Sequence, residues 1–389
     1  MTAHHAVILG AGAAGTAAAR ALVGHAGIHT TIIGRTGETP YSRMLIKGVA
    51  YGSVEPGLTR LPLPDADFIA DTVEIVDTET REVRLTSGRT VAYDSLIVAT
   101  GSRPRRLDTD LPGAEQAARA GSLFTLHSLD DAVRIREAVL ACGRPARIAI
   151  YGAGLIASET ASALQEQGHR ISLIARSELP GVAAFGRSVA ARIAADHRLR
   201  VATHFGRTIE RIRLDMDATV VTLDDGTDID ADLVIFALGT TPVAPAPWDI
   251  GVDVDDRLRA HGVRAHGVPN VLAAGGTAVH HDDHLGSWRI DHWDDGAAQG
   301  AHAAQALLHS LGRGDDPGPY RPRSAHMAMI HGRVVAGVGF TDRPEDALIE
   351  GVEEFVVVHE HGDTVVGASG IDAVGAVYQW GQRLHEGSS

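Results

Sequence analysis

Two glycine-rich segments have the residue types and spacing that bind the phosphates of a dinucleotide. In the first, a short apolar run is followed by Gly10, Gly12 and Gly15. The first glycine would permit a tight turn, the second would let the backbone approach a pyrophosphate, and the third would let a helix pack on a strand. Unpaired N–H groups at the helix N-terminus would bind the phosphates. The segment from Ala6 to Arg35 therefore predicts a strand–turn–helix–strand unit.

The second segment repeats this pattern further along the chain. A strand over 148–151 is followed by Gly152 and Gly154, and Ala157 takes the place of the third glycine. A single turn of this kind is weak evidence, because Gly-rich turns are common. Two of them, each between a strand and a helix, predict two dinucleotides bound on two domains.

In both units a basic residue stands where a carboxylate usually binds the ribose. The carboxylate is expected about 20 residues after the turn, at the end of the second strand. This chain has Arg35 there in the first unit and Arg176 in the second. An arginine favours a 2′-phosphate over a 2′-hydroxyl, so Arg176 slightly favours NADPH over NADH. The alternatives are an exposed arginine at a strand end and, in the first unit, Glu38 as a replacement carboxylate.

The composition is that of an ordinary globular protein. The chain has 389 residues, 44% of them hydrophobic and 22% charged, and a net charge of -14. This length allows two or three domains. The acidic balance argues against nucleic-acid binding, which needs a basic surface. No run reaches the ~18 apolar residues that span a bilayer, so we expect a cytoplasmic protein with no membrane partner, either a monomer or a homodimer.

Cys142 is the only cysteine in the chain. This excludes an intramolecular disulfide and any chemistry that needs a pair of cysteines within the chain. The residue lies at the end of a predicted helix, where an inert, half-buried thiol is the favoured interpretation.

The elements around the two turns also repeat. Each unit is followed by a β-meander, over 72–93 and 201–223, and then by a buried strand that ends in glycine, over 96–101 and 233–239. An internal duplication with the second unit inserted in the first explains this order. We expect an α/β fold with two Rossmann-like domains and a small α+β C-terminal domain. The predicted domains are 1–107 with 239–312, then 108–238, then 313–389.

Together the motifs resemble the FAD-dependent pyridine nucleotide-disulphide oxidoreductases. Within them they resemble the ferredoxin reductase-like branch, of the putidaredoxin and rhodocoxin reductase type, which supplies electrons to ferredoxins. The segments that carry the resemblance are the two turns, PYSRMLIKG at 40–48, ATGSRPR at 99–105, GAGLIASE at 152–159, FALGTTP at 236–242 and RIDHW at 289–293. The segment at 40–48 stands where disulfide-using relatives carry their redox cysteines.

The resemblance implies a flavin site with Lys47 and Glu159 as the catalytic pair beside the flavin N5. A fixed positive charge there would stabilise negative charge on the reduced ring, and the carboxylate would hold it in place. The alternatives are a surface lysine and an ordinary helix carboxylate. The candidate cofactor-binding residues, for FAD and NAD(P)H together, are Gly10, Gly12, Ala13, Ala14, Gly15, Arg35, Arg43, Lys47, Ala99, Thr100, Gly101, Arg103, Gly152, Gly154, Leu155, Ile156, Glu159, Arg176, Gly239, Gly275, Gly276, His292 and Trp293.

The sequence departs from the family pattern in three places. Arg35 replaces a ribose-binding glutamate, and Gly276 stands where the family has an aspartate that hydrogen-bonds the ribityl chain. Ser158 and Glu159 follow Ala157, where a glycine and an apolar residue are usual. Each lost hydrogen bond to a charged acceptor would cost ~1.5 to 3 kcal/mol, or tenfold to hundredfold in affinity, if nothing replaced it. We therefore expect FAD to bind more weakly or to use other anchors.

The expected function is hydride transfer from NAD(P)H to the flavin, followed by electron transfer to a ferredoxin-type iron–sulfur protein. One alternative is a flavin-dependent oxidase or reductase that acts on oxygen, a quinone or a small biosynthetic substrate. The other is a nucleotide-binding scaffold that has lost redox chemistry. The run from Arg103 to Arg106 could bind an acidic ferredoxin, clamp a phosphate or form a solvated turn.

Several histidines allow more than one interpretation. The run from His280 to His284 could bind a metal, but a solvated loop is favoured, so we expect no metal site. His326 and His331 occupy the stretch where relatives face the flavin, and packing at a domain seam is the alternative. His292 could be structural rather than part of the cofactor site.

Overall fold

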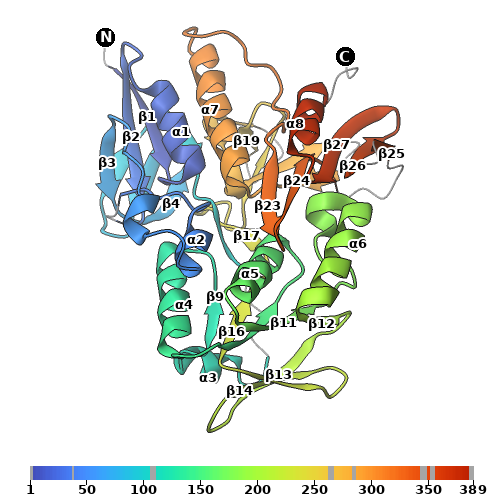
Figure 1. Cartoon of the computed structure of the whole chain (residues 1–389). Helices are drawn as coiled ribbons and strands as arrows, with labels where there is room; N and C mark the ends of the chain where they lie inside the picture. The colour runs from blue at the N-terminus through green and yellow to red at the C-terminus, as the bar shows by residue number, and fades with distance from the viewer. Residues whose placement is uncertain are drawn as a thin grey trace. The chain divides into compact units, whose positions relative to one another are not determined.

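The computed structural model describes residues 3–36, 39–105, 111–261, 267–282, 286–341, 348–350 and 355–384 (Figure 1). The chain forms two compact units. Unit 1 comprises Met1–Met44, Thr59–Arg103 and Thr240–Pro322, and unit 2 comprises Leu45–Leu58, Pro104–Gly239 and Arg323–Ser389. The predicted α/β class with parallel sheets is confirmed. The division into three domains stays a prediction.

Unit 1 is built around a nine-stranded sheet in the order β22-β21-β18-β19-β20-β7-β1-β2-β3. Its parallel part consists of β20 (Gly267–Ala273), β7 (Ser95–Val98), β1 (His4–Leu9), β2 (Ile28–Gly34) and β3 (Asp67–Ala70). A parallel sheet is buried on both faces, which explains the continuous apolar runs of its strands. Val7, Ile8 and Leu9 of β1 are wholly buried.

The other strands of unit 1 extend this sheet or form small separate sheets. The extension consists of β18 (Val252–Val254), β19 (Arg259–His261), β21 (Ala278–Asp282) and β22 (Gly286–Trp288). The meander expected over 72–93 is present as β4 (Val73–Asp77), β5 (Glu82–Leu85) and β6 (Thr90–Ala92), and a ribbon pairs β8 (Ser102–Pro104) with β17 (Thr240–Pro242).

Two helices of unit 1, α1 (Ala13–Leu22) and α7 (Trp293–Ser310), lie side by side (Figure 1). They approach closely because their facing residues are small: a Cβ on Gly300 of α7 would collide with the carbonyl oxygen of Ala14 on α1. The short 3-10 turn η2 (Gly275–Thr277) follows β20. These three elements bring the first glycine turn, Gly275 and the start of α7 to one end of the unit.

Unit 2 contains a second parallel sheet, in the order β12-β11-β10-β16-β9. Its strands are β9 (Leu123–Thr125), β10 (Arg147–Tyr151), β11 (Arg170–Ala175), β12 (Ala202–Phe205) and β16 (Leu233–Phe236). Its helices are α2 (Ile46–Ala50), α3 (Ala114–Arg119), α4 (Leu129–Ala141), α5 (Leu155–Glu166) and α6 (Val182–Arg200), and η1 (Pro56–Thr59) follows α2. A meander of β13 (Ile209–Leu214), β14 (Thr219–Leu223) and β15 (Asp228–Ala231) repeats the one in unit 1.

The C-terminal part of unit 2 is an antiparallel sheet in the order β23-β24-β27-β26-β25 with one helix (Figure 1). Its elements are β23 (His326–Ile330), β24 (Arg333–Gly339), β25 (Leu348–Glu350), β26 (Phe355–His361), β27 (Thr364–Ile371) and α8 (Val374–Arg383). The sheet shares a hydrophobic core with α6, in which Phe185 and Val189 join Val357 and Ile371. Helix α6 and strand β25 were not predicted from the sequence.

None of the helices in the described part of the chain combines the length and the apolar character needed to cross a membrane.

Candidate nucleotide-binding sites and ion pair

The first glycine turn, in unit 1, has the geometry that its three glycines require. Gly10 has a φ of +108°, and a Cβ there would collide with the carbonyl oxygen of Ala99. A Cβ on Gly15 would collide with the carbonyl oxygen of Gly10, so α1 lies directly against the turn. A Cβ on Gly12 would meet nothing within 4 Å, and no side chain caps α1 at this residue. The N-terminus of α1 is therefore free to accept a phosphate.

The end of strand β7 lies beside this turn, because β7 pairs with β1. Ala99 contacts Gly10, Thr100 donates a hydrogen bond to the carbonyl oxygen of Val243, and Gly101 has a φ of +74°. The predicted site residues of this segment thus lie together with the first glycine turn.

A buried polar network fixes the turn at Gly275 and Gly276. The N–H of Gly275 donates to Oε1 of Gln299 at 2.8 Å, and Nε2 of Gln299 donates to Oδ2 of Asp295 at 2.6 Å. The Tyr320 hydroxyl donates to Oδ1 of Asp295 at 2.7 Å. Burial raises the pKa of Asp295 above its ordinary value. The network holds Gly275 beside α1, where a Cβ on it would lie 3.0 Å from that of Ala14.

Asp291 lies against Gly276. Its Oδ2 accepts hydrogen bonds from Ser102 at 2.6 Å and Thr240 at 2.5 Å, and Nη1 of Arg289 lies 3.3 Å away. Its Oδ1 occupies the space that a Cβ on Gly276 would need. Burial opposes ionisation of Asp291, but the hydrogen bonds from Ser102 and Thr240 and the charge of Arg289 hold its pKa below the ordinary value.

The arginines predicted for the first site lie in different surroundings. Arg35 is exposed directly after β2, and Glu38, its possible replacement, falls outside the described residues. Arg43 is half-buried and its charge acts on Asp291. Arg103 is exposed and its Nε lies 3.4 Å from Oγ1 of Thr241. Within unit 1, Arg43 therefore belongs to the Gly276 region, whereas Arg35 marks the end of β2.

The second glycine turn, in unit 2, repeats the geometry of the first. A Cβ on Gly152 would collide with the carbonyl oxygen of Ala237, just as Gly10 meets Ala99. Gly154 begins α5 with no capping side chain, and a Cβ on it would meet nothing within 4 Å. Leu155 and Ile156 form the first turn of α5. Strand β16 leads to Ala237, and Gly239 follows with a φ of +79°.

Arg176 is exposed directly after β11, at the same edge of the sheet as the second glycine turn. The neighbouring strand β12 is followed by Arg207, whose N–H donates to the carbonyl oxygen of Ala175 at 3.0 Å and whose side chain pairs with Asp225. Arg176 has no acidic partner among the described ion pairs. A positive charge therefore stands where a ribose carboxylate is usual.

Lys47 and Glu159 form an ion pair within unit 2. Lys47 lies on α2 and Glu159 on α5, 112 residues apart in sequence. Their side chains are 18% and 12% exposed, so the pair is largely removed from water. Oε1 of Glu159 also accepts a hydrogen bond from the N–H of Met329 on β23, at 3.2 Å. The two predicted catalytic residues are thus brought together, and they share a third element.

Helix α2 is fixed on α5 by a second set of contacts. The Tyr51 hydroxyl and the Thr160 hydroxyl lie 2.7 Å apart, and Nε2 of Gln167 donates to the carbonyl oxygen of Tyr51 at 2.7 Å. Burial raises the pKa of Tyr51 far above its ordinary value. These contacts place Lys47 rigidly beside Glu159, so the lysine is not a solvated surface residue.

Lys47 is also the only lysine in the chain. The sequence has 35 lysine and arginine residues, and the other 34 are arginine. A lysine carries a compact, freely rotating ammonium group, whereas arginine carries a planar guanidinium. An ordinary surface position would accept either, so the single lysine favours a role that needs an ammonium group.

The histidines of the C-terminal strands pack inside unit 2. Nε2 of His326 lies 2.9 Å from the carbonyl oxygen of Ala184, and its ring packs on Phe185. His331 is buried, with its Nε2 2.9 Å from Nδ1 of His197. Burial and the neighbouring His331 lower the pKa of His197 to about 3. His326 and His331, the two histidines for which the sequence allowed a place beside the flavin, therefore both contact helix α6.

The described part of the histidine run in unit 1 is a strand and not the solvated loop that was favoured from the sequence. His280 and His281 lie in strand β21, and His280 is buried with its ring stacked 3.7 Å from Trp288. Asp283 and His284 fall outside the described residues. The expectation of a loop overlooked the pairing of β21 with β22, which buries every second residue. Among the residues that the structure describes, no cluster of ligands could hold a metal.

His292 and Trp293 begin helix α7. His292 is the N-cap residue and Trp293 the first helical residue, and both are half-buried. They directly follow Asp291 and thus lie at the same end of unit 1 as Gly276. Asp291, Ser102 and Gln299 were not singled out from the sequence, and the only signal for Asp291 was its place inside the RIDHW segment.

The sequence of the chain matches one protein family over most of its length. The pyridine nucleotide-disulphide oxidoreductase family matches residues 4–306, which include both glycine turns and the ion pair. The chain belongs to this family. It is therefore an oxidoreductase, as the sequence predicted.

Curated proteins and solved structures similar to the chain include ferredoxin reductases and an NADPH oxidase. The chain is 29% identical to the ferredoxin–NAD(+) reductase component of the anthranilate 1,2-dioxygenase system of Burkholderia cepacia, over 79% of this chain and 76% of that protein. It is 25% identical to the corresponding component of the biphenyl dioxygenase system of Paraburkholderia xenovorans, over 88% and 83%. A putidaredoxin reductase–putidaredoxin complex matches with a TM-score of 0.83 at 22% identity, over 97% and 92%. An engineered water-forming NADPH oxidase bound to NADPH matches with a TM-score of 0.78 at 20% identity, over 97% and 90%.

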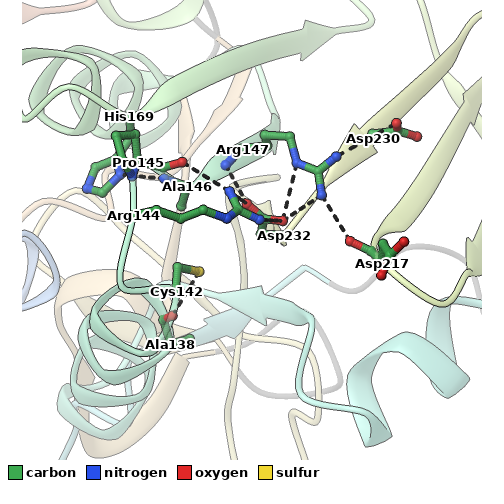
Figure 2. Close-up of polar contacts among 10 residues, drawn as sticks. All are labelled: Ala138, Cys142, Arg144, Pro145, Ala146, Arg147, His169, Asp217, Asp230 and Asp232. Carbon is green, nitrogen blue, oxygen red and sulfur yellow. Dashed lines mark hydrogen bonds and ion pairs between the residues drawn. The ribbon is translucent and has the colours of Figure 1, made fainter.

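This member of the pyridine nucleotide-disulphide oxidoreductase family has no cysteine pair to form the disulfide of the family name. Its one cysteine, Cys142, lies at the end of α4, with Sγ 3.4 Å from the carbonyl oxygen of Ala138 (Figure 2). Burial raises the pKa of the Cys142 thiol. A raised pKa disfavours the reactive thiolate. The inert thiol expected from the sequence agrees with these contacts.

A charged cluster near Cys142 anchors the opposite end of the second sheet. The carboxylate of Asp232 accepts hydrogen bonds from the side chains of Arg144 and Arg147 and from the N–H of Arg147, at 2.7–3.2 Å (Figure 2). Burial opposes ionisation, but these hydrogen bonds hold the pKa of Asp232 well below its usual range. Arg147 begins β10, whereas Gly152 follows its carboxyl end. The cluster therefore fixes the start of the strand that leads to the glycine turn, at the end of β10 away from that turn.

Proposed function

We propose that this protein is an FAD-dependent NAD(P)H oxidoreductase that passes electrons to a ferredoxin-type iron–sulfur protein. The Lys47–Glu159 ion pair carries the proposal, because it is a largely buried pair that joins α2 to α5, the helix that follows the second glycine turn. A chain with one cysteine cannot pass electrons to an internal disulfide. The curated relatives named above are reductases of ferredoxins, which supports an external iron–sulfur acceptor.

The residues of unit 1 fit FAD. The backbone of Gly12 is open toward the N-terminus of α1, where a pyrophosphate would bind. Ala13 and Ala14 have small side chains, and Gly275 continues the same surface. When bound, FAD would supply the chemistry that accepts a hydride from a reduced pyridine nucleotide and releases electrons one at a time. No protein nucleophile is needed for either process.

Lys47 supplies a fixed positive charge in this proposal, and Glu159 positions it. The ammonium group would stabilise negative charge that develops on the reduced ring. Glu159 prevents the flexible lysine side chain from turning toward water, and the N–H of Met329 orients the carboxylate in turn. A scaffold without redox chemistry would have no need of this buried pair, so the pair favours an enzyme over that alternative.

NADPH is the preferred coenzyme in this proposal, although the curated relatives are named for NAD(+). Ala175, Arg176 and Ser177 follow one another after β11, and Ala157 lies 18 residues before Ala175. The engineered NADPH oxidase carries substitutions that introduce alanine, arginine and serine in a row, and a glycine-to-alanine change 18 residues earlier. The same residues at the same interval support binding of a 2′-phosphate at Arg176.

Exposed arginines could bind an acidic protein partner. Arg103 and Arg105 are exposed, while Arg106 falls outside the described residues. The whole chain carries a net charge of -14, so a ferredoxin that is itself acidic would need a local basic surface to approach. A monomer or homodimer located in the cytoplasm stays our prediction for the protein as a whole.

The proposed function is tested with the purified protein. We would record its visible spectrum with and without added FAD and then titrate it anaerobically with NADPH and with NADH. We expect flavin absorbance that NADPH bleaches, and cytochrome c reduction that requires an added ferredoxin. Absence of flavin absorbance after FAD addition would overturn the flavoenzyme. Bleaching by NADH alone would contradict the role of Arg176, and rapid oxygen consumption without ferredoxin would identify an oxidase instead.

A further inference from the structure

The carboxylate of Asp291 occupies the space that a side chain at position 276 would need. Family members carry an aspartate at the position of Gly276, on the resemblance described above, and this chain has no side chain there. A Cβ on Gly276 would collide with Oδ1 and approach Cγ of Asp291 to 3.0 Å. The carboxylate of Asp291 therefore fills the place where the missing side chain would begin. No residue larger than glycine fits at 276 while Asp291 keeps this position.

The two oxygens of Asp291 have different surroundings. Oδ2 accepts hydrogen bonds from Ser102 and Thr240 and faces Arg289. Arg289 is fixed in turn, because its Nη1 donates to the carbonyl oxygen of Gly276 at 3.1 Å and its Nη2 to Thr240. The described residues donate no hydrogen bond to Oδ1. An ionised carboxylate oxygen is an acceptor only, so Oδ1 can accept a hydrogen bond from a ligand.

We infer that Asp291 replaces the absent aspartate of position 276 and binds a hydroxyl group of the ribityl chain of FAD. This inference rests on the proposed function, because it takes FAD as the ligand of unit 1. The carboxylate reaches the site from the segment before α7 instead of from η2. Ser102, Thr240 and Arg289 hold it in one orientation before the ligand arrives, which lowers the entropy lost on binding. The substitution at 276 then removes no anchor, because the anchor has moved to another element.

The inference is tested by moving the carboxylate back. FAD is titrated into the apoprotein of each variant, and quenching of flavin fluorescence gives the Kd. We expect Asp291→Ala to weaken FAD binding roughly tenfold to hundredfold, the loss of a hydrogen bond to a charged acceptor. Gly276→Asp alone should also weaken binding, because two carboxylates cannot share the space. Gly276→Asp combined with Asp291→Ala should restore the wild-type Kd.

Controls separate ligand binding from folding. Asp294, in the first turn of α7, is exposed, so Asp294→Asn removes the same charge three residues away and should leave the Kd unchanged. Asp291→Asn keeps the shape of the side chain if the alanine variant does not fold, and it should still weaken FAD binding. An unchanged Kd in both Asp291 variants, or a double variant no better than Asp291→Ala, would overturn the inference. Failure of the wild type to bind FAD would instead overturn the proposed function.

Discussion

The Lys47–Glu159 ion pair allows a double-mutant test with a predictable magnitude. Lys47→Met keeps the unbranched stem and removes the charge, which leaves Glu159 with the N–H of Met329 as its described partner. Breaking a buried ion pair costs ~3 to 5 kcal/mol, because a charge stays buried without its partner. The side chains here are 18% and 12% exposed, so water screens part of this cost. We expect a loss of ~2 to 3 kcal/mol in stability.

The double variant decides whether this loss comes from the pair itself. Glu159→Gln alone leaves the ammonium group uncompensated and should also destabilise the protein. Lys47→Met with Glu159→Gln contains neither charge, so its loss should be smaller than the sum by ~1 to 2 kcal/mol. Thermal unfolding measures this as a difference of about 2 °C in Tm for each kcal/mol. Glu137→Gln removes an exposed carboxylate of α4 and serves as the control. Additive shifts in Tm would refute the coupling.

The single lysine supplies a local measurement of the same pair. Protein grown with carbon-13-labelled lysine gives one lysine side-chain signal in an NMR spectrum, because Lys47 is the only lysine. We expect this signal to shift in Glu159→Gln and to stay in place in Glu137→Gln. A signal at the position of a solvated lysine in every variant would show that the pair does not form in solution, whatever the Tm values are.

Three further predictions concern the coenzyme, the first turn and pH. Arg176→Gln should raise KM for NADPH roughly tenfold to hundredfold and leave KM for NADH nearly unchanged. Steady-state kinetics measures both KM values, and Arg170→Gln, at the other end of β11, is the control. Equal effects on both coenzymes would contradict the prediction. Gly12→Val should fold, since a Cβ on Gly12 meets open space, but it should lose FAD; Gly10→Val should not fold. Circular dichroism measures folding, and FAD titration measures binding. A Gly12→Val protein that keeps FAD would be inconsistent with phosphate binding at Gly12. The buried His197 has a pKa lowered from 6.5 to about 3, so the unfolded chain binds its proton first and stability should fall as pH drops from about 6.5 toward 3. Tm measured across this range should fall less in His197→Gln, and an identical pH profile would disprove this source.

The elements that the sequence predicted well are those whose signals are local. The strand–turn–helix units around Gly10 and Gly152 follow from apolar runs and glycines at fixed spacing, and both are present with the geometry that the glycines require. Helix α6 was missed because Gly186, with a φ of +73°, interrupts its helical backbone and its pattern. Strand β21 was taken for a loop because a run of histidines and aspartates is uncommon in strands. Its pairing with β22 outweighs that preference.

The candidate site was predictable where one segment decides it and unpredictable where two distant segments meet. The sequence alone placed Lys47 and Glu159 only through a family resemblance, since no local rule joins residues 112 apart. It marked Gly276 as a lost anchor because a sequence shows the missing side chain and not what fills its space. The neighbour that fills it, Asp291, follows another strand, and only the fold brings the two together.

The two glycine turns differ at their third glycine position, where the first has Gly15 and the second has Ala157. In the first turn, Gly15 lets α1 lie directly against the carbonyl oxygen of Gly10. In the second, Ala157 occupies the third position, and its Cβ would lie 3.3 Å from a Cβ on Gly152. The extra methyl group limits how closely helix and turn can approach. In the proposed function the first turn, beside the Gly275 segment that the buried Gln299–Asp295 network fixes, would bind FAD, and the second turn, with exposed Arg176 at its edge, would bind the pyridine nucleotide.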